Sequence, residues 1–94
     1  MVLTILEGLI QPEKWESLRE KYRGIAANIP RQMVSTTLLQ NRNEPTHWKV
    51  ISIWRSQEEL AEYRKSVEVP EGIRLFKAFG VEPILSVYDV REFK

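Results

Sequence analysis

The sequence predicts a single α+β domain in which helices cover one face of a four-stranded antiparallel sheet. Two observations carry this prediction: the length of 94 residues, and the alternation of β-type runs with amphipathic helical runs. A chain of this length has room for one hydrophobic core. We therefore treat residues 1–94 as one domain.

The first strand and the first helix are predicted on either side of Pro12. Residues 2–10 are rich in aliphatic and β-branched side chains, which is typical of a strand. Pro12 suits the first turn of a helix, because its missing N–H would be unpaired there. Pro30 ends the helix, because a residue that precedes proline avoids the α conformation. The apolar stripe of this helix consists of Trp15, Leu18, Tyr22, Ile25 and Ile29.

A β-hairpin is predicted in the middle of the chain. Residues 32–41 and 47–55 are two further β-type runs, and the polar segment 42–46 joins them. If residue 41 faces residue 47, the helix-facing side of the hairpin places Thr36 opposite Ser52 and Val34 opposite Trp54.

A second helical region and a last strand complete the domain. Ser56, followed three residues later by Glu59, predicts a capping box at the helix start. Pro70 interrupts this helix, a short second helical piece follows over 71–79, and Gly80 ends it. Residues 83–93 form the fourth predicted strand. The buried stripe of the second helix consists of Leu60, Tyr63 and Val67.

The resulting order, β-α-β-β-α-β, is that of ferredoxin-like domains. Helices can cover only one face of such a sheet, and the other face of a monomer would be polar. The predicted first strand is apolar on both faces, and the third strand presents Ile51 and Ile53 on the face opposite Trp48, Val50 and Trp54. We therefore predict a homodimer that forms through the sheet face bearing Ile51 and Ile53.

Composition excludes several classes of function. The chain has no cysteine and one histidine, His47, so we expect neither disulfides nor a bound metal ion. The formal net charge of +1, with both signs interspersed, argues against a nucleic-acid partner. The RNA-recognition motif shares the strand order, but the run HWKVISIW lacks its glycine and its aromatic spacing. The N-terminus resembles neither a signal peptide nor a membrane span, so we expect a cytoplasmic protein.

Three segments carry a recognisable pattern: IQPEKWESL at a strand-to-helix junction, NIPRQMVSTTLLQ at a helix exit and second strand, and KVISIWRSQEELAEYRKS at a strand that ends in tryptophan before a capped helix. Together they resemble the antibiotic biosynthesis monooxygenase family of the dimeric α/β barrel superfamily. The resemblance implies a pocket between sheet and helices. There, cofactor-independent members let molecular oxygen react with a small aromatic, phenolic or quinol-like substrate. A haem-degrading branch has an asparagine near the position of Leu6 and a histidine after the second helix. Both are missing here, so we expect no cofactor.

Five residues are candidates for binding such a substrate: Trp54, Ser52, Thr36, Tyr63 and Phe76. Trp54 matches the tryptophan that ends a strand in the family, and either forms a cavity wall or fills the core. The hydroxyl residues Thr36 and Ser52 are small enough to leave space under the helices. Tyr63 offers a hydroxyl donor or packs in the core, and Phe76 is spaced for a buried helix face.

Catalytic residues are not identified by any pattern in the sequence. His47 borders a polar loop and is expected to be solvated. Glu7 interrupts an apolar strand, either as a desolvated acid or as a partner of Arg or Lys at a dimer edge. Two functions stay open: a cofactor-independent monooxygenase-like enzyme, and a non-catalytic, ligand-binding or regulatory homodimer.

Overall fold

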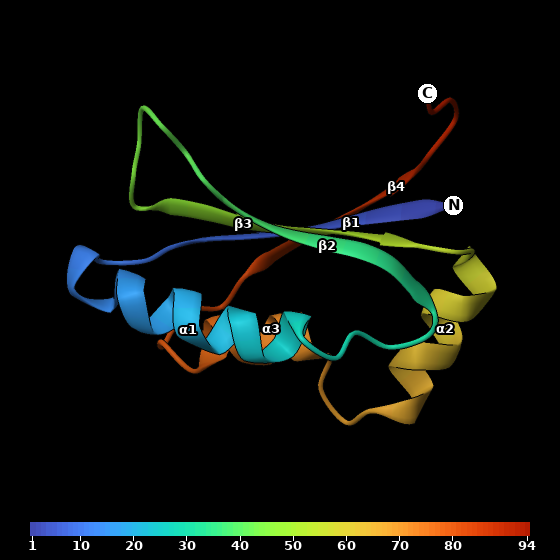
Figure 1. The fold of residues 1–94 in the computed structure, drawn as a ribbon, viewed down its shortest axis with the longest axis horizontal. Helices are drawn as coiled ribbons and strands as arrows, with labels where there is room; N and C mark the ends of the chain where they lie inside the picture. Colours follow the sequence, from blue (N-terminus) through green and yellow to red (C-terminus); the bar gives the residue numbers. More distant parts are fainter.

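The sheet forms one layer of the molecule and the helices form the other (Figure 1). The computed structural model describes residues 1–94. In chain order the elements are β1 (Val2–Leu9), the 3-10 turn η1 (Pro12–Lys14), α1 (Trp15–Ala26), β2 (Met33–Gln40), β3 (His47–Trp54), α2 (Gln57–Ser66), α3 (Glu71–Lys77) and β4 (Ile84–Asp89). The strand order is β2-β3-β1-β4 with every neighbouring pair antiparallel, which confirms the predicted ferredoxin-like α+β fold.

The last strand is shorter than the sequence predicted. We expected residues 83–93, whereas β4 ends at Asp89. β4 pairs only with β1, and Asp89 lies opposite Val2, the first residue of β1. The ladder therefore stops where its single partner begins. The first helix also differs, because it opens with a 3-10 turn at Pro12 and its α-helical part ends at Ala26.

Half of the predicted capping box forms at the start of α2. The Ser56 hydroxyl accepts a hydrogen bond from the Glu59 backbone N–H at 3.1 Å, as predicted. The reciprocal bond is absent, because the Glu59 carboxylate lies 3.8 Å from the Arg31 guanidinium instead. Gly80 has a φ angle of 75°, which is the left-handed conformation expected for a residue that terminates a helix.

A β-bulge at Val34 changes the predicted register at one end of the hairpin. Thr36 lies opposite Ser52 as expected, but Met33, not Val34, lies opposite Trp54. The register shifts between Met33 and Ser35, so Val34 is an extra residue in β2 and is exposed. Extra residues of this kind bend a strand and increase its twist. The bulge therefore brings a long, flexible methionine to the helix-facing side.

The buried core consists of two separate clusters under the sheet. The larger one contains Leu6, Ile10, Leu18, Trp48, Val50, Leu75 and Phe76. The smaller one contains Val2, Trp54, Leu60 and Tyr63. In Figure 1 α1 and α3 lie together under one part of the sheet, and α2 lies apart from them at the other end. Because α2 lies apart from α1 and α3, the two clusters do not merge into one core.

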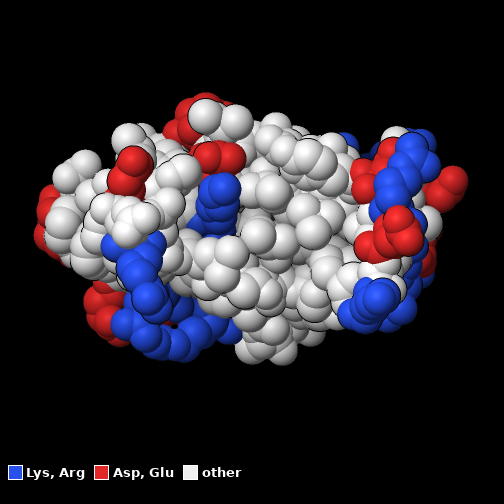
Figure 2. All heavy atoms as spheres, turned by 90° about the horizontal axis from the view of Figure 1, so that it is seen from above, with Lys and Arg blue, Asp and Glu red and all other residues white.

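The outer face of the sheet carries no helix and is largely uncharged (Figure 2). Lys, Arg, Asp and Glu side chains gather at the two ends of this view, and few lie between them. Leu9 and Ile84 expose 60 % and 65 % of their surface, and Tyr88 also is exposed. Ile51 and Ile53 lie on this face and are half-buried. An apolar face of this extent is typical of a contact surface.

Gly8 is expected to be intolerant of a side chain. A Cβ atom at Gly8 would lie 2.7 Å from Val81 and 3.1 Å from the ring of Phe76, whereas one at Gly24 in α1 would meet nothing within 4 Å. We expect Gly8→Ala to lower the free energy of unfolding by about 1 to 3 kcal/mol through overpacking. Gly24→Ala is the matched control and should raise it by about 0.4 to 1 kcal/mol. Urea titration checks both signs, and equal effects would contradict the packing argument.

Candidate functional site

A cavity of about 490 Å³ lies between the sheet and the helices, in the gap that separates the two core clusters. Its lining includes Leu6, Val50 and Leu75 from the larger cluster. From the smaller cluster it includes Trp54, Leu60 and Tyr63. Cavities of about 300 to 1,000 Å³ with mostly apolar walls are typical of small-molecule sites. The cavity therefore has the size and the wall chemistry of a ligand site.

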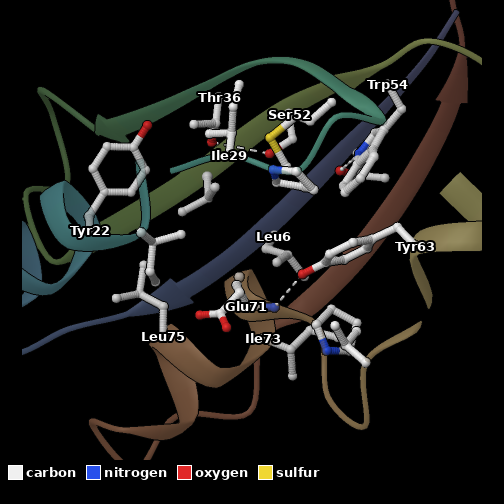
Figure 3. Close-up of a pocket in the computed structure, with 18 of the residues that line it drawn as sticks. Leu6, Tyr22, Ile29, Thr36, Ser52, Trp54, Tyr63, Glu71, Ile73 and Leu75 are labelled. Carbon is white, nitrogen blue, oxygen red and sulfur yellow. Dashed lines mark hydrogen bonds between the residues drawn. The ribbon is translucent and has the colours of Figure 1, made fainter. Parts of the chain in front are cut away.

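Four of the five predicted site residues line this cavity (Figure 3): Trp54, Ser52, Thr36 and Tyr63. Phe76 is not among the lining residues. It is 0 % exposed, and its ring packs close to Gly8, where the missing Cβ leaves room for it. Neighbouring residues of α3, including Ile73 and Leu75, reach the cavity in its place. The structure thus brings four candidates together and puts the fifth in the adjacent core.

Three hydroxyl residues form a row across the sheet beneath the cavity. Thr36 of β2 lies opposite Ser52 of β3, which in turn lies opposite Thr4 of β1. The Ser52 hydroxyl donates to Thr36 Oγ1 at 3.2 Å, and the Trp54 indole N–H donates to Thr4 Oγ1 at 3.0 Å. The row therefore gives an otherwise apolar cavity a polar floor. Sequence reasoning missed Thr4, although it is the one polar side chain on the helix-facing side of its strand.

An aromatic pair forms one wall of the cavity. The ring centroids of Trp54 and Tyr63 are 5.0 Å apart, with the ring planes tilted by 39°. The Tyr63 hydroxyl accepts a hydrogen bond from the Glu71 backbone N–H at 3.0 Å (Figure 3). Because that bond uses the hydroxyl as an acceptor, its proton is free to be donated to a ligand. Trp54 and Tyr63 thus combine a flat apolar surface with one hydrogen-bond donor.

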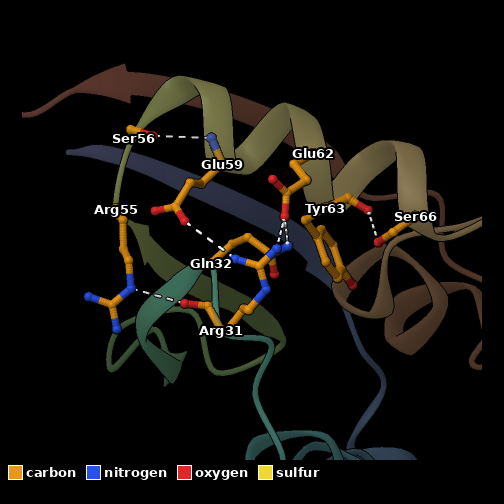
Figure 4. Close-up of polar contacts among 8 residues, drawn as sticks. All are labelled: Arg31, Gln32, Arg55, Ser56, Glu59, Glu62, Tyr63 and Ser66. Carbon is orange, nitrogen blue, oxygen red and sulfur yellow. Dashed lines mark hydrogen bonds and ion pairs between the residues drawn. The ribbon is translucent and has the colours of Figure 1, made fainter.

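The loop that connects α1 to β2 forms a second wall and is fastened to α2 (Figure 4). The Arg31 guanidinium pairs with the Glu62 carboxylate, and the Gln32 side-chain amide donates to the same carboxylate at 2.8 Å. The Arg31 carbonyl accepts a bond from the Arg55 guanidinium at 2.9 Å. Loop residues that line the cavity include Asn28, Ile29 and Pro30. The Arg31 contacts therefore fix this wall in place, a role that the sequence did not reveal.

Charged groups at the cavity are few. The lining contains one carboxylate, that of Glu71, which lies 3.2 Å from the Arg74 guanidinium. It also contains two basic side chains, Lys21 and Arg64. The sequence did not single out any of these three residues. In a helix sequence, a charged residue that borders a cavity has the same spacing as one that faces open solvent. Glu71 is the only lining carboxylate that could accept a proton from a ligand.

His47 and Glu7 lie on the opposite side of the sheet. They form a hydrogen bond of 2.9 Å between His47 Nε2 and Glu7 Oε1 on the outer face. The prediction of a solvated His47 is wrong, because its side chain exposes only 23 % of its surface and contacts Glu7. Within the subunit the Glu7 carboxylate therefore pairs with a histidine, and its predicted pairing with Arg or Lys at a dimer edge stays a prediction. On the helix side, Tyr22 of the predicted apolar stripe lines the cavity.

Two further features bear on function. No group of three or more His, Cys, Asp or Glu side chains comes together in the structure in a way that could hold a metal ion. None of the helices has both the length and the apolar character needed to cross a membrane.

Comparison with known proteins gives a consistent result. The family model described as antibiotic biosynthesis monooxygenase matches residues 1–79. A candidate antibiotic biosynthesis monooxygenase from Deinococcus radiodurans is 16 % identical, with a TM-score of 0.77 over 100 % of this chain and 96 % of the other. SnoaB, a cofactor-independent oxygenase from Streptomyces nogalater, is 18 % identical, with a TM-score of 0.68 over 98 % and 94 % of the two chains. A Mycobacterium tuberculosis protein is 15 % identical, with a TM-score of 0.72 over 98 % and 96 %. At these identities the structures show a shared fold. No curated protein matches the sequence.

Proposed function

The chain belongs to the antibiotic biosynthesis monooxygenase family, and we propose that its cavity binds a small, flat aromatic or quinol-like substrate. The protein then oxidises this substrate with molecular oxygen, without a cofactor. The observation that carries the proposal is the cavity wall of Trp54 and Tyr63 above a floor of hydroxyl groups. A flat ring can stack on the indole, while its oxygen substituents find hydrogen-bond partners at Tyr63 and at the floor.

The proposed reaction needs no external reductant. With a phenolic substrate, one ring carbon exchanges its hydrogen for one oxygen atom, and the phenol hydroxyl loses its hydrogen to become a carbonyl. Both hydrogens leave as water with the second oxygen atom, so the substrate supplies all the electrons that reduce the oxygen molecule. In this scheme Glu71 accepts the phenol proton and Tyr63 donates a hydrogen bond to the oxygen anion that results.

We further propose that the working unit is a homodimer formed through the outer sheet face. The whole molecule measures 37 by 22 Å along the two axes that lie in the plane of Figure 2, which sets the largest outline of this face. That footprint is comparable to the area of about 800 Å² per partner in a standard interface. The tip of the β2–β3 hairpin and the C-terminus both rise above this face in Figure 1, so both could reach the second copy in such a dimer.

A non-catalytic ligand-binding role is the second candidate. It is favoured by the lack of a histidine in the lining and by the existing pairing of Glu71 with Arg74. Two measurements on the same protein separate the candidates. Titration with the neutral fluorescent probe phenylnaphthylamine reports binding in the cavity. Oxygen uptake with a dihydroxynaphthalene, above the spontaneous rate, reports turnover. Binding without uptake supports the second candidate, and absence of both rejects the cavity as a ligand site.

Removing the Tyr63 hydroxyl should separate its chemical role from its packing role. Tyr63→Phe keeps the ring against Trp54 and loses one hydrogen bond, so we expect the free energy of unfolding to fall by about 1 kcal/mol. If the hydroxyl assists the reaction, oxygen uptake should fall by about 100-fold while phenylnaphthylamine binding is unchanged. Tyr22→Phe, at the other tyrosine of the lining, is the matched control. Equal loss of uptake in both variants would contradict the role given to Tyr63.

A further inference from the structure

The lining of the cavity carries an excess of positive charge. Lys21 comes from α1 and Arg64 from α2, and both line the cavity. Neither has a carboxylate oxygen within 4.0 Å, whereas Glu71, the one acidic residue of the lining, is paired with Arg74. The chain as a whole has a net charge of +1, so this excess is local and is not a property of the entire surface.

A second hollow extends the cavity between α1 and α3 and is also basic. It measures about 430 Å³ and shares Lys21, Ile25, Glu71 and Leu75 with the cavity. It adds Arg74 and Lys77 to the lining. Of the four basic side chains that border the two hollows, Arg74 pairs with Glu71 and Lys77 lies 3.8 Å from the Glu82 carboxylate. Lys21 and Arg64 are the two without a carboxylate partner. An apolar cavity that continues into a basic hollow has the form expected for a ligand with two chemically different ends.

We infer that the ligand of this cavity is an anion, in which a flat apolar ring system carries a carboxylate, sulfonate or phosphate group. The inference rests on the proposed function, because it assumes that the cavity is the ligand site. The ring system occupies the space beside Trp54 and Tyr63, and the anionic group lies toward the exposed cationic side chains of the lining, Lys21 on α1 or Arg64 on α2. Basic side chains next to an apolar cavity are screened by solvent less than those on an open surface, so they favour an anion there.

Two probes of nearly the same shape test this inference. Anilinonaphthalene sulfonate carries one negative charge, and phenylnaphthylamine lacks the sulfonate and is neutral. We expect the sulfonate to bind at least about 5-fold more tightly at low salt, as one charge pair at a partly exposed site allows. The preference should shrink as salt is added. Competition between the probes establishes that both occupy one site, which separates cavity binding from adsorption on the outer sheet face.

Variants that each remove one positive charge show which side chains cause the preference for the sulfonate probe. Lys21→Gln and Arg64→Gln should each reduce sulfonate binding, and the double variant should bring it to the level of the neutral probe. Binding of the neutral probe should be unchanged in all of them. Arg42→Gln removes an equivalent charge from the hairpin loop, far along the sheet, and is the matched control. All three positions are exposed, so the variants should fold as the parent does.

The outcomes of these experiments test the anion inference and the proposed function separately. Tighter sulfonate binding that depends on Lys21 and Arg64, but not on Arg42, supports the inference. Equal binding of the two probes, or a preference that survives the double variant, overturns it and leaves the cavity as a site for neutral ligands. If neither probe binds, the proposed function itself fails and the inference fails with it.

Discussion

Replacing Trp54 with alanine is expected to lower the free energy of unfolding by about 3 kcal/mol, the lower end of the range for a buried aromatic residue. Trp54 is 5 % exposed, packs with Val2, Leu60 and Tyr63, and bonds through its indole N–H to Thr4. One side of the ring faces a cavity that already exists, so fewer contacts are lost than in a closed core. A loss of this size should lower the melting temperature by at least about 10 °C.

The same variant should bind flat probes poorly. Loss of the indole surface should weaken phenylnaphthylamine binding by about 10-fold or more, since an aromatic contact of this kind contributes on the order of 1 kcal/mol beyond its buried area. Phe76→Leu is the matched control, because Phe76 is buried in the other cluster and does not line the cavity. It should destabilise the fold and leave binding intact. Equal losses of binding in both variants would show that binding merely follows stability, and Trp54 would then be a core residue only.

The two interpretations of Trp54 that the sequence left open turn out to be compatible. The indole is both a member of a core cluster and a cavity wall. This is a consequence of the split core, which depends on where α2 lies relative to α1 and α3. Periodicity in a sequence shows which face of a helix is apolar, but not whether another apolar surface meets it. The same limitation explains Phe76, whose spacing predicted a buried face and whose ring packs in the core next to Gly8.

Local signals predicted the topology, and long-range pairings decided the details of the site. The hairpin register was accessible because a short loop joins β2 and β3, so the Thr36–Ser52 pair was found. Thr4 completes the hydroxyl row through the pairing of β1 with β3, whose sequence separation is much larger. No local pattern specifies that register. The bulge at Val34 also escaped prediction, because neither glycine nor proline marks it in the sequence.

Charged residues were the least predictable part of the site. Lys21 and Arg64 lie on helices with many other charges, and sequence spacing does not distinguish a cavity mouth from open solvent. Arg31 follows a proline in a turn, and its pairing with Glu62 depends on how that turn meets α2. His47 and Glu7 lie on neighbouring strands, so only the register of β1 and β3 brings them together. In each case the function of the charge depends on tertiary packing.

The last prediction concerns the outer sheet face, where Ile53→Asp is expected to break the homodimer. Ile53 is half-buried within the isolated subunit and lies between Leu3 of β1 and Ser35 of β2. In a two-fold symmetric dimer the substitution places two carboxylates in one apolar interface, and burial of an unpaired charge costs several kcal/mol for each ion. The dissociation constant should rise by more than about 100-fold, which corresponds to about 2.7 kcal/mol.

Sedimentation velocity at micromolar concentration measures this effect, and far-ultraviolet circular dichroism shows whether the separated subunit stays folded. Ala61→Asp introduces the same charge on the exposed surface of α2, on the helix side of the molecule, and should leave the dimer intact. The parent protein should sediment as a dimer and Ile53→Asp as a monomer. A parent that sediments as a monomer, or an Ile53→Asp variant as dimeric as the Ala61→Asp control, would contradict pairing through this face. The apolar face would then need a different occupant to explain its exposed Leu9 and Ile84.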